Sequence, residues 1–118
     1  MQVLGIHHVS INVTDVDEAL AFYTGPLGLT VRDDRPAFGF PGAWLAAGDQ
    51  QIHLIGAPTP QNLGQHLAMQ VADLHATVAE LREQGIDVTD PSVVGPGLQS
   101  FLVDPSGNAV ELYQRTAP

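Results

Sequence analysis

The stretch HVSINVTDVDEA, residues 8–19, recurs in altered form as HLAMQVADLHAT, residues 66–77. The leading histidines align, and Asp15 aligns with Asp73, so the two copies lie 58 residues apart. A repeat of this length indicates that one supersecondary unit is built twice, which constrains the fold more than any single motif. The chain is therefore expected to form two similar modules.

The repeat extends to the far end of each module. GDQQIHLI, residues 48–55, aligns with SGNAVELY, residues 106–113, at the same offset of 58. His53 then falls on Glu111, and a leucine follows each of them. Between these anchors GLTV and GIDV align at an offset of 57, so one residue is lost and later regained.

The boundary between the modules is the stretch GAPTPQNLG, residues 56–64. Its two prolines and two glycines are typical of a loop. A chain of 118 residues is most simply one domain. We expect a single domain over residues 1–118, made of modules 1–57 and 64–118.

Hydrophobic periodicity predicts the order β-α-β-β-β in each module. Asp15, followed by Glu18, and Asp73 are candidate N-caps of the two helices. Gly28 and Gly85 follow the helical patterns. The strands expected after the helices are 30–32, 43–47 and 51–55 in the first module, and 87–89, 100–103 and 109–114 in the second.

Strand alternation predicts which side chains share a face, because successive residues point to opposite sides of a sheet. In the first strand, His7 is expected on the apolar face as a packing or surface residue, and His8 on the opposite face. His53, His66 and Glu111 likewise oppose the apolar side chains of their own strands. The apolar faces should pack on the helices, so these four polar side chains occupy corresponding places on the other face.

Three imidazoles and one carboxylate at corresponding positions suit a divalent transition metal ion such as Zn, Ni, Co, Mn or Fe. The pattern predicts a metal site formed by His8, His53, His66 and Glu111. The alternative, that each is an ordinary surface or packed polar residue, stays open. His75 has no counterpart in this pattern and is expected on an exposed helix surface.

The composition excludes several classes of function. The chain has 13 acidic residues, four arginines and no lysine, with a net charge of −9, so it lacks both a basic patch for nucleic acid and a Schiff-base lysine. The absence of cysteine excludes disulfides and thiolate metal sites. No apolar run is long enough to span a membrane and no signal peptide is visible, so a cytoplasmic location is expected.

Five motifs spread over nearly the whole chain resemble the vicinal oxygen chelate superfamily: HHVSINVTD, GPLGL, QIHL, HLAMQVADL and DPSGNAVEL. That superfamily includes glyoxalase I, fosfomycin-resistance thiol transferases, methylmalonyl-CoA epimerase, extradiol dioxygenases and bleomycin-binding proteins. The resemblance implies an α+β fold in which two βαβββ modules form a cupped mixed sheet with the helices on its outer face. It also implies that short chains of two modules form homodimers, with each site built from modules of two chains.

Residue by residue, the resemblance assigns the metal ligands to His8, His53, His66 and Glu111. Glyoxalase I usually has a carboxylate where this chain has His53, which leaves Glu111 as the candidate catalytic base. The expected function is a metal-dependent lyase or isomerase of glyoxalase type, which moves a proton next to a carbonyl of a small substrate. The alternatives are an Fe(II) dioxygenase, a fosfomycin-type transferase, and a protein that binds a small molecule or antibiotic without catalysis.

Candidate substrate contacts are few. Arg35 and Arg115 are the cations best placed to meet a substrate carboxylate, and the alternative that each is an ordinary surface arginine stays open. Phe38, Phe40 and Trp44 could line an apolar wall, or could pack in a core. We expect Arg35, Trp44 and Arg115 to contact the substrate.

Overall fold

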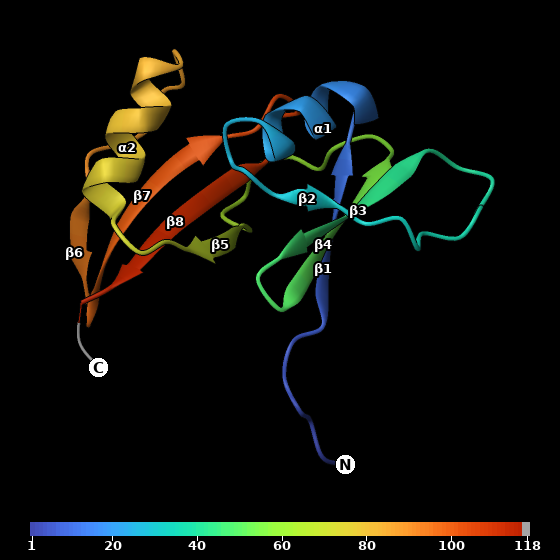
Figure 1. The fold of residues 1–118 in the computed structure, drawn as a ribbon, viewed down its shortest axis with the longest axis horizontal. Helices are drawn as coiled ribbons and strands as arrows, with labels where there is room; N and C mark the ends of the chain where they lie inside the picture. The colour runs from blue at the N-terminus through green and yellow to red at the C-terminus, as the bar shows by residue number, and fades with distance from the viewer. Residues whose placement is uncertain (117–118) are drawn as a thin grey trace. The chain divides into compact units, whose positions relative to one another are not determined.

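The computed structural model describes residues 1–116 and divides the chain into two compact units, with the boundary between Gln61 and Asn62. Each unit contains one helix and four strands (Figure 1). The first unit contains β1 (His8–Val13), α1 (Val16–Thr24), β2 (Thr30–Val31), β3 (Gly42–Ala47) and β4 (Gln50–Gly56). The second contains β5 (Leu67–Gln70), α2 (Leu74–Glu83), β6 (Ser92–Val94), β7 (Gly97–Val103) and β8 (Ala109–Arg115).

Each unit forms its own four-stranded mixed sheet. The strand orders are β1-β4-β3-β2 and β5-β8-β7-β6, so the first and last strands of each unit are neighbours. These neighbours run parallel, whereas the other pairs are antiparallel. The predicted α+β class and the order βαβββ are confirmed in both units.

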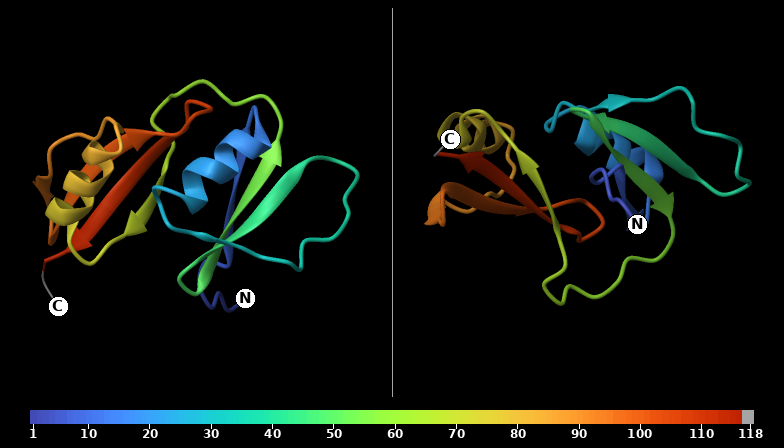
Figure 2. Two further views of the ribbon diagram at one scale, coloured as in Figure 1. Left: turned by 45° about the horizontal axis from the view of Figure 1, so that its top comes forward. Right: turned by 90° about the horizontal axis from the view of Figure 1, so that it is seen from below.

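A helix covers the apolar face of each sheet. α1 packs on β3 and β4, and α2 packs on β7 and β8 (Figure 2). Four side chains that strand alternation placed on the helix side are buried: Ile52, Leu54, Val110 and Leu112 are all at most 4% exposed. The alternation also holds for His53, which lies between Ile52 and Leu54 in the chain and points to the other face.

Both helices begin at the predicted aspartates. Asp15 accepts a hydrogen bond from the backbone N–H of Glu18, and Asp73 accepts one from that of Ala76, each at 3.0 Å. These caps satisfy donors that have no partner within the helix. With nine and ten residues, neither helix in the described part of the chain could span a membrane.

The second helix ends in a Schellman motif, for which Gly85 is required. The N–H of Gly85 donates to Arg82 O and the N–H of Ile86 donates to Leu81 O, both at 3.0 Å. This pattern needs a left-handed residue after the C-cap, and Gly85 has φ +79°.

Two local predictions were wrong. Residues 87–89 do not form a strand, and the edge strand of the second sheet is β6, Ser92–Val94. Thr89 donates one backbone hydrogen bond, to Phe101 O, but Pro91 then interrupts the ladder because it has no N–H. His7 is exposed, in agreement with the prediction of a packing or surface residue, but it was placed on the face opposite to His8, whereas the two Nδ1 atoms lie 2.9 Å apart. Alternation fails here because β1 begins at His8.

Candidate functional site

Strand register reproduces the sequence repeat at the predicted ligands. In the first unit Ser10 on β1 pairs with His53 on β4, and in the second Ala68 on β5 pairs with Glu111 on β8. His8 and His66 lie two residues before Ser10 and Ala68: His8 is the first residue of β1, and His66 immediately precedes β5. The structure therefore brings together one pair of predicted ligands in each unit.

An aromatic residue accompanies each pair. On β3, Trp44 pairs with His53, and on β7, Phe101 pairs with Glu111. The Phe101 ring lies edge-on to the His66 ring at 5.4 Å. Sequence analysis missed Phe101, although the 57-residue offset of the central strands relates it to Trp44.

In the first unit the histidines are part of a stack of rings. The His53 ring lies 4.0 Å from the His8 ring and 4.3 Å from the Trp44 ring, with interplanar angles of 12° and 9°. The flanking rings come from the strands on either side of β4, so His53 is only 8% exposed. We call His8 and His53 the histidine pair.

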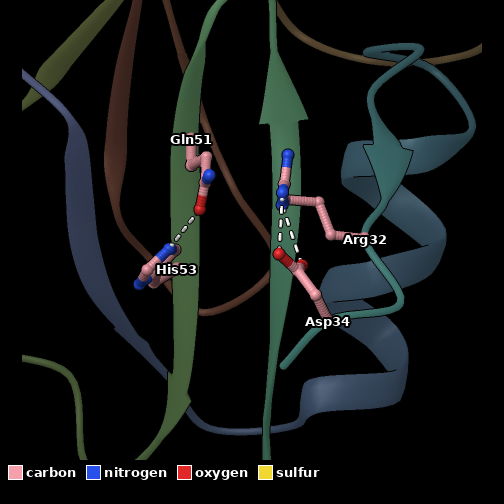
Figure 3. A network of polar contacts seen from close by, with 4 residues as sticks. All are labelled: Arg32, Asp34, Gln51 and His53. Carbon is pink, nitrogen blue, oxygen red and sulfur yellow. Dashed lines mark hydrogen bonds and ion pairs between the residues drawn. The ribbon is translucent and has the colours of Figure 1, made fainter. Parts of the chain in front are cut away.

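Polar side chains lie near His53 (Figure 3). Gln51 Oε1 lies 2.8 Å from His53 Nε2. Nearby, Arg32 donates two hydrogen bonds to the carboxylate of Asp34, at 2.9 and 2.7 Å. The bond from Arg32 lowers the pKa of Asp34, whereas burial, followed by the proximity of His8, lowers the pKa of His53.

In the second unit the imidazole and carboxylate meet directly. His66 Nε2 lies 3.0 Å from Glu111 Oε1, and His66 Nδ1 lies 2.8 Å from Gly64 O. A carbonyl oxygen only accepts, so Nδ1 carries a hydrogen, and in the neutral ring Nε2 then presents a lone pair to the carboxylate. Two acceptors this close need a cation between them, either a proton on Nε2 or a metal ion. We call His66 and Glu111 the histidine–glutamate pair.

The two pairs should titrate in opposite directions. The hydrogen bonds to Gly64 O and Glu111 raise the pKa of His66, whereas burial lowers that of His53. In metal-free protein, imidazole C–H signals followed by NMR should show His66 titrating above the usual histidine range and His53 below it. Glu111→Gln should lower the pKa of His66 and leave that of His53 unchanged; equal pKa values for both histidines would contradict the two environments.

The sign of each contribution to stability follows from these shifts. Protonated His66 stabilises the folded state below the ordinary histidine pKa of about 6.5, and this contribution is lost as pH rises through the raised value. Neutral His53 is favoured in the folded state, so its contribution is present above about pH 6.5 and is lost as pH falls through the lowered value.

The residues of the histidine–glutamate pair fit a divalent metal ion. Two ligand atoms about 2.1 Å from one ion and at right angles to each other lie about 3.0 Å apart, which is the separation of His66 Nε2 and Glu111 Oε1. The bond of Nδ1 to Gly64 O is the kind of outer contact that orients a metal-binding histidine.

The histidine pair fits a shared ion less directly, because nitrogens of parallel rings do not converge until a ring turns. Within residues 1–116, no group of three or more His, Cys, Asp or Glu side chains is close enough to hold a metal ion. The four-ligand site therefore stays a prediction, of which the structure supplies two pairs.

The predicted substrate contacts have defined surroundings. Arg35 donates to Phe40 O at 2.9 Å, and its guanidinium lies over the rings of Phe38 and Phe40 at 5.1 and 5.3 Å. Arg35 also lines an open hollow with the first turn of α1 and residues 56–58, and no predicted metal ligand lines that hollow. Arg115 lies at the exposed end of β8 opposite Gly97.

Trp44 contacts more of the predicted site than either arginine does. Besides stacking on His53, it approaches Phe38 at 6.1 Å, and Phe38 stacks on Phe40 at 5.2 Å. We call the rings of His8, His53, Trp44, Phe38 and Phe40 the aromatic row. His75 lies on the exposed side of α2, as predicted.

Known proteins resemble this chain over almost its whole length. Glyoxylase I 4 of Arabidopsis thaliana is 30% identical over 95% of this chain and 71% of its own. Lactoylglutathione lyase GLX1 of the same plant is 29% identical over 92% of this chain and 43% of its own. The crystal structure of TnmS3, an antibiotic binding protein from Streptomyces sp. CB03234, superimposes with a TM-score of 0.83 over 98% of both chains, at 27% identity.

A family model covers residues 5–112, which include most of each unit and all four predicted ligands. The repeated βαβββ unit, the paired ligand positions and this match lead to one conclusion. The chain belongs to the glyoxalase/bleomycin resistance protein/dioxygenase superfamily.

Proposed function

We propose that the protein is a metal-dependent enzyme of glyoxalase type, a lyase or isomerase that moves a proton next to a carbonyl of a small substrate. The observation that carries the proposal is the histidine–glutamate pair, in which two acceptor atoms face each other at 3.0 Å and an outer hydrogen bond sets the imidazole tautomer. A divalent ion bound there supplies a Lewis acid for two neighbouring substrate oxygens.

Glu111 is the proposed proton carrier. It is the one carboxylate among the predicted ligands, and its side chain is 13% exposed, so little water competes for it. A positioned carboxylate can accept a proton from carbon next to a polarised carbonyl and return it to the neighbouring carbon. His66 holds the carboxylate in place from one side.

The complete site needs both pairs. Since each unit supplies two of the four ligands, we propose a homodimer in which the histidine pair of one chain and the histidine–glutamate pair of the other hold one ion. This is the arrangement expected of short members of the superfamily. A two-fold dimer then has two equivalent sites.

Mixing two inactive variants tests this arrangement. His8→Ala damages the histidine pair, and Glu111→Ala damages the histidine–glutamate pair. If sites cross the chains, unfolding and refolding a mixture gives heterodimers with one intact site and one doubly damaged site. Random pairing then restores metal binding to about a quarter of the wild-type capacity.

The matched control for this experiment is a mixture of His8→Ala with His53→Ala. Both changes damage the same unit, so no combination of these chains restores a site. Recovery of metal binding in the control mixture would contradict shared sites. So would a test mixture that forms dimers normally but recovers no metal binding.

The substrate proposed here carries little negative charge. Arg32 forms an ion pair with Asp34, and Arg82 forms one with Asp90. With no lysine and a net charge of −9, the chain has few cations left for a substrate with several carboxylates, such as a glutathione adduct.

A second candidate function is binding of a small molecule without catalysis. The aromatic row favours it, because Phe38 and Phe40 are 46% and 45% exposed and stack on each other, and the Phe38 ring lies 6.1 Å from that of Trp44. Flat rings of this kind bind planar apolar ligands. Metal analysis of purified protein separates the two functions, because only the enzyme requires a stoichiometric ion.

A further inference from the structure

We propose that Gln51 is the positioning residue of His53, holding a hydrogen on Nε2 and leaving Nδ1 as the nitrogen that binds metal. The inference rests on the proposed function in one respect, that His53 is a metal ligand. Gln51 and His53 are two residues apart on β4, so their side chains lie on the same face of the sheet. They meet at 2.8 Å (Figure 3).

The chemistry of the contact sets the tautomer. The side-chain oxygen of Gln51 only accepts hydrogen bonds, so at 2.8 Å His53 Nε2 donates. A histidine that binds a metal ion is neutral, and a neutral imidazole that carries its hydrogen on Nε2 has its lone pair on Nδ1. Metal ions bind the nitrogen with the lone pair.

Ring stacking and the hydrogen bond control different motions of His53. Trp44 and His8 lie against the two faces of its ring, at 4.3 and 4.0 Å, and keep its plane nearly parallel to theirs. Stacking does not distinguish the ring from the same ring turned by 180° about its Cβ–Cγ bond, which moves each nitrogen to the place of a ring carbon. Gln51 makes that distinction, because it offers an acceptor on one edge only.

The second unit supports this role for Gln51. The residue that corresponds to Gln51 is Ala109, and the residue that corresponds to His53 is Glu111. The two oxygens of a carboxylate are equivalent, so Glu111 needs no neighbour to select one. Gln51 thus lies beside His53, whose two nitrogens differ. At the corresponding position beside Glu111, whose two oxygens are equivalent, the chain has alanine.

The two units then offer opposite nitrogens to a metal ion. His66 has its Nδ1 hydrogen bonded to Gly64 O, which leaves Nε2 for the ion. His53 has its Nε2 hydrogen bonded to Gln51, which leaves Nδ1. In both cases an outer acceptor fixes the tautomer, the role that such contacts have at metal sites generally.

The first experiment is ¹⁵N NMR of the imidazole rings in metal-free protein, with His53 assigned by its loss in His53→Ala. Wild type should show hydrogen on His53 Nε2 and slow exchange of that hydrogen with water. Gln51→Met, which has similar length but no strong acceptor, should lose the slow exchange. Gln51→Glu should restore it, because a carboxylate also accepts. Gln50→Met, on the opposite face of β4, is the matched control and should behave as wild type.

The second experiment repeats the spectra with Zn²⁺ and measures its affinity. In wild type, Nε2 should keep its hydrogen while the Nδ1 resonance shifts, and Gln51→Met should weaken Zn²⁺ binding by about 10–100-fold, the usual effect of removing an outer contact. Gln51→Glu should bind Zn²⁺ at least as well as wild type.

Each outcome decides the inference. Hydrogen on Nδ1 in metal-free wild type, loss of the Nε2 hydrogen on adding Zn²⁺, or unchanged exchange and affinity in Gln51→Met would overturn it. If wild type binds no Zn²⁺, the proposed metal function fails, and the metal-free spectra of wild type and Gln51→Met still decide whether Gln51 sets the tautomer.

Discussion

His66→Ala is expected to weaken metal binding by at least about 100-fold, more than the loss of an outer contact does. The variant removes Nε2, one of the two donor atoms that lie 3.0 Å apart in the histidine–glutamate pair. It also leaves Glu111 without its oriented partner. Elemental analysis of purified protein and a titration with Zn²⁺ measure the loss.

His75→Ala is the matched control for this variant. It makes the same substitution in the same unit, on the exposed side of α2, and should bind metal as wild type does. Circular dichroism of both variants tests whether they fold. A His66→Ala protein that folds and keeps a full equivalent of metal would remove His66 from the ligands and end the four-ligand proposal.

Glu111→Gln should lower turnover by about 100-fold or more, the usual contribution of a positioned base. Glutamine keeps the shape and one oxygen that can still bind a metal ion, so the variant should retain much of its metal. It loses the basicity that proton transfer requires. Turnover per bound metal ion, measured with a panel of hemithioacetals, 2-oxo thioesters and catechols, separates these two properties.

Glu83→Gln makes the same chemical change at the exposed end of α2 and is the control for charge. If Glu111→Gln binds metal more weakly but its rate per bound ion is unchanged, Glu111 is a ligand only and another group moves the proton. If metal-loaded wild type turns over no member of the panel, the second candidate function, binding without catalysis, is favoured.

The sequence alone was sufficient to predict the architecture, because a repeat and a strand period are both properties of spacing. An offset of 58 residues relates His8 to His66 and His53 to Glu111, and the strand registers reproduce that relation. The N-caps Asp15 and Asp73 could also be predicted from the sequence, because an N-cap depends only on the next three residues. The family resemblance was read from motifs of the same kind.

The strand at 87–89 and the face of His7 could not be predicted in this way. Both lie next to the end of a regular element, at a proline or before the first paired residue, where alternation no longer holds. Phe101 was missed for a different reason. Its importance depends on a cross-strand pairing with Glu111, which only the register of β7 and β8 establishes.

Spacing along the chain determined which residues carry the candidate chemistry, and tertiary structure decided the chemical state in which each is presented. The lone pair of His66 depends on Gly64 O, and that of His53 on Gln51. The plane of the His53 ring depends on side chains from the two strands that flank β4. A strand period determines the side to which a side chain points, but ring rotation and tautomer depend on neighbours that only folding brings within hydrogen-bonding or van der Waals contact.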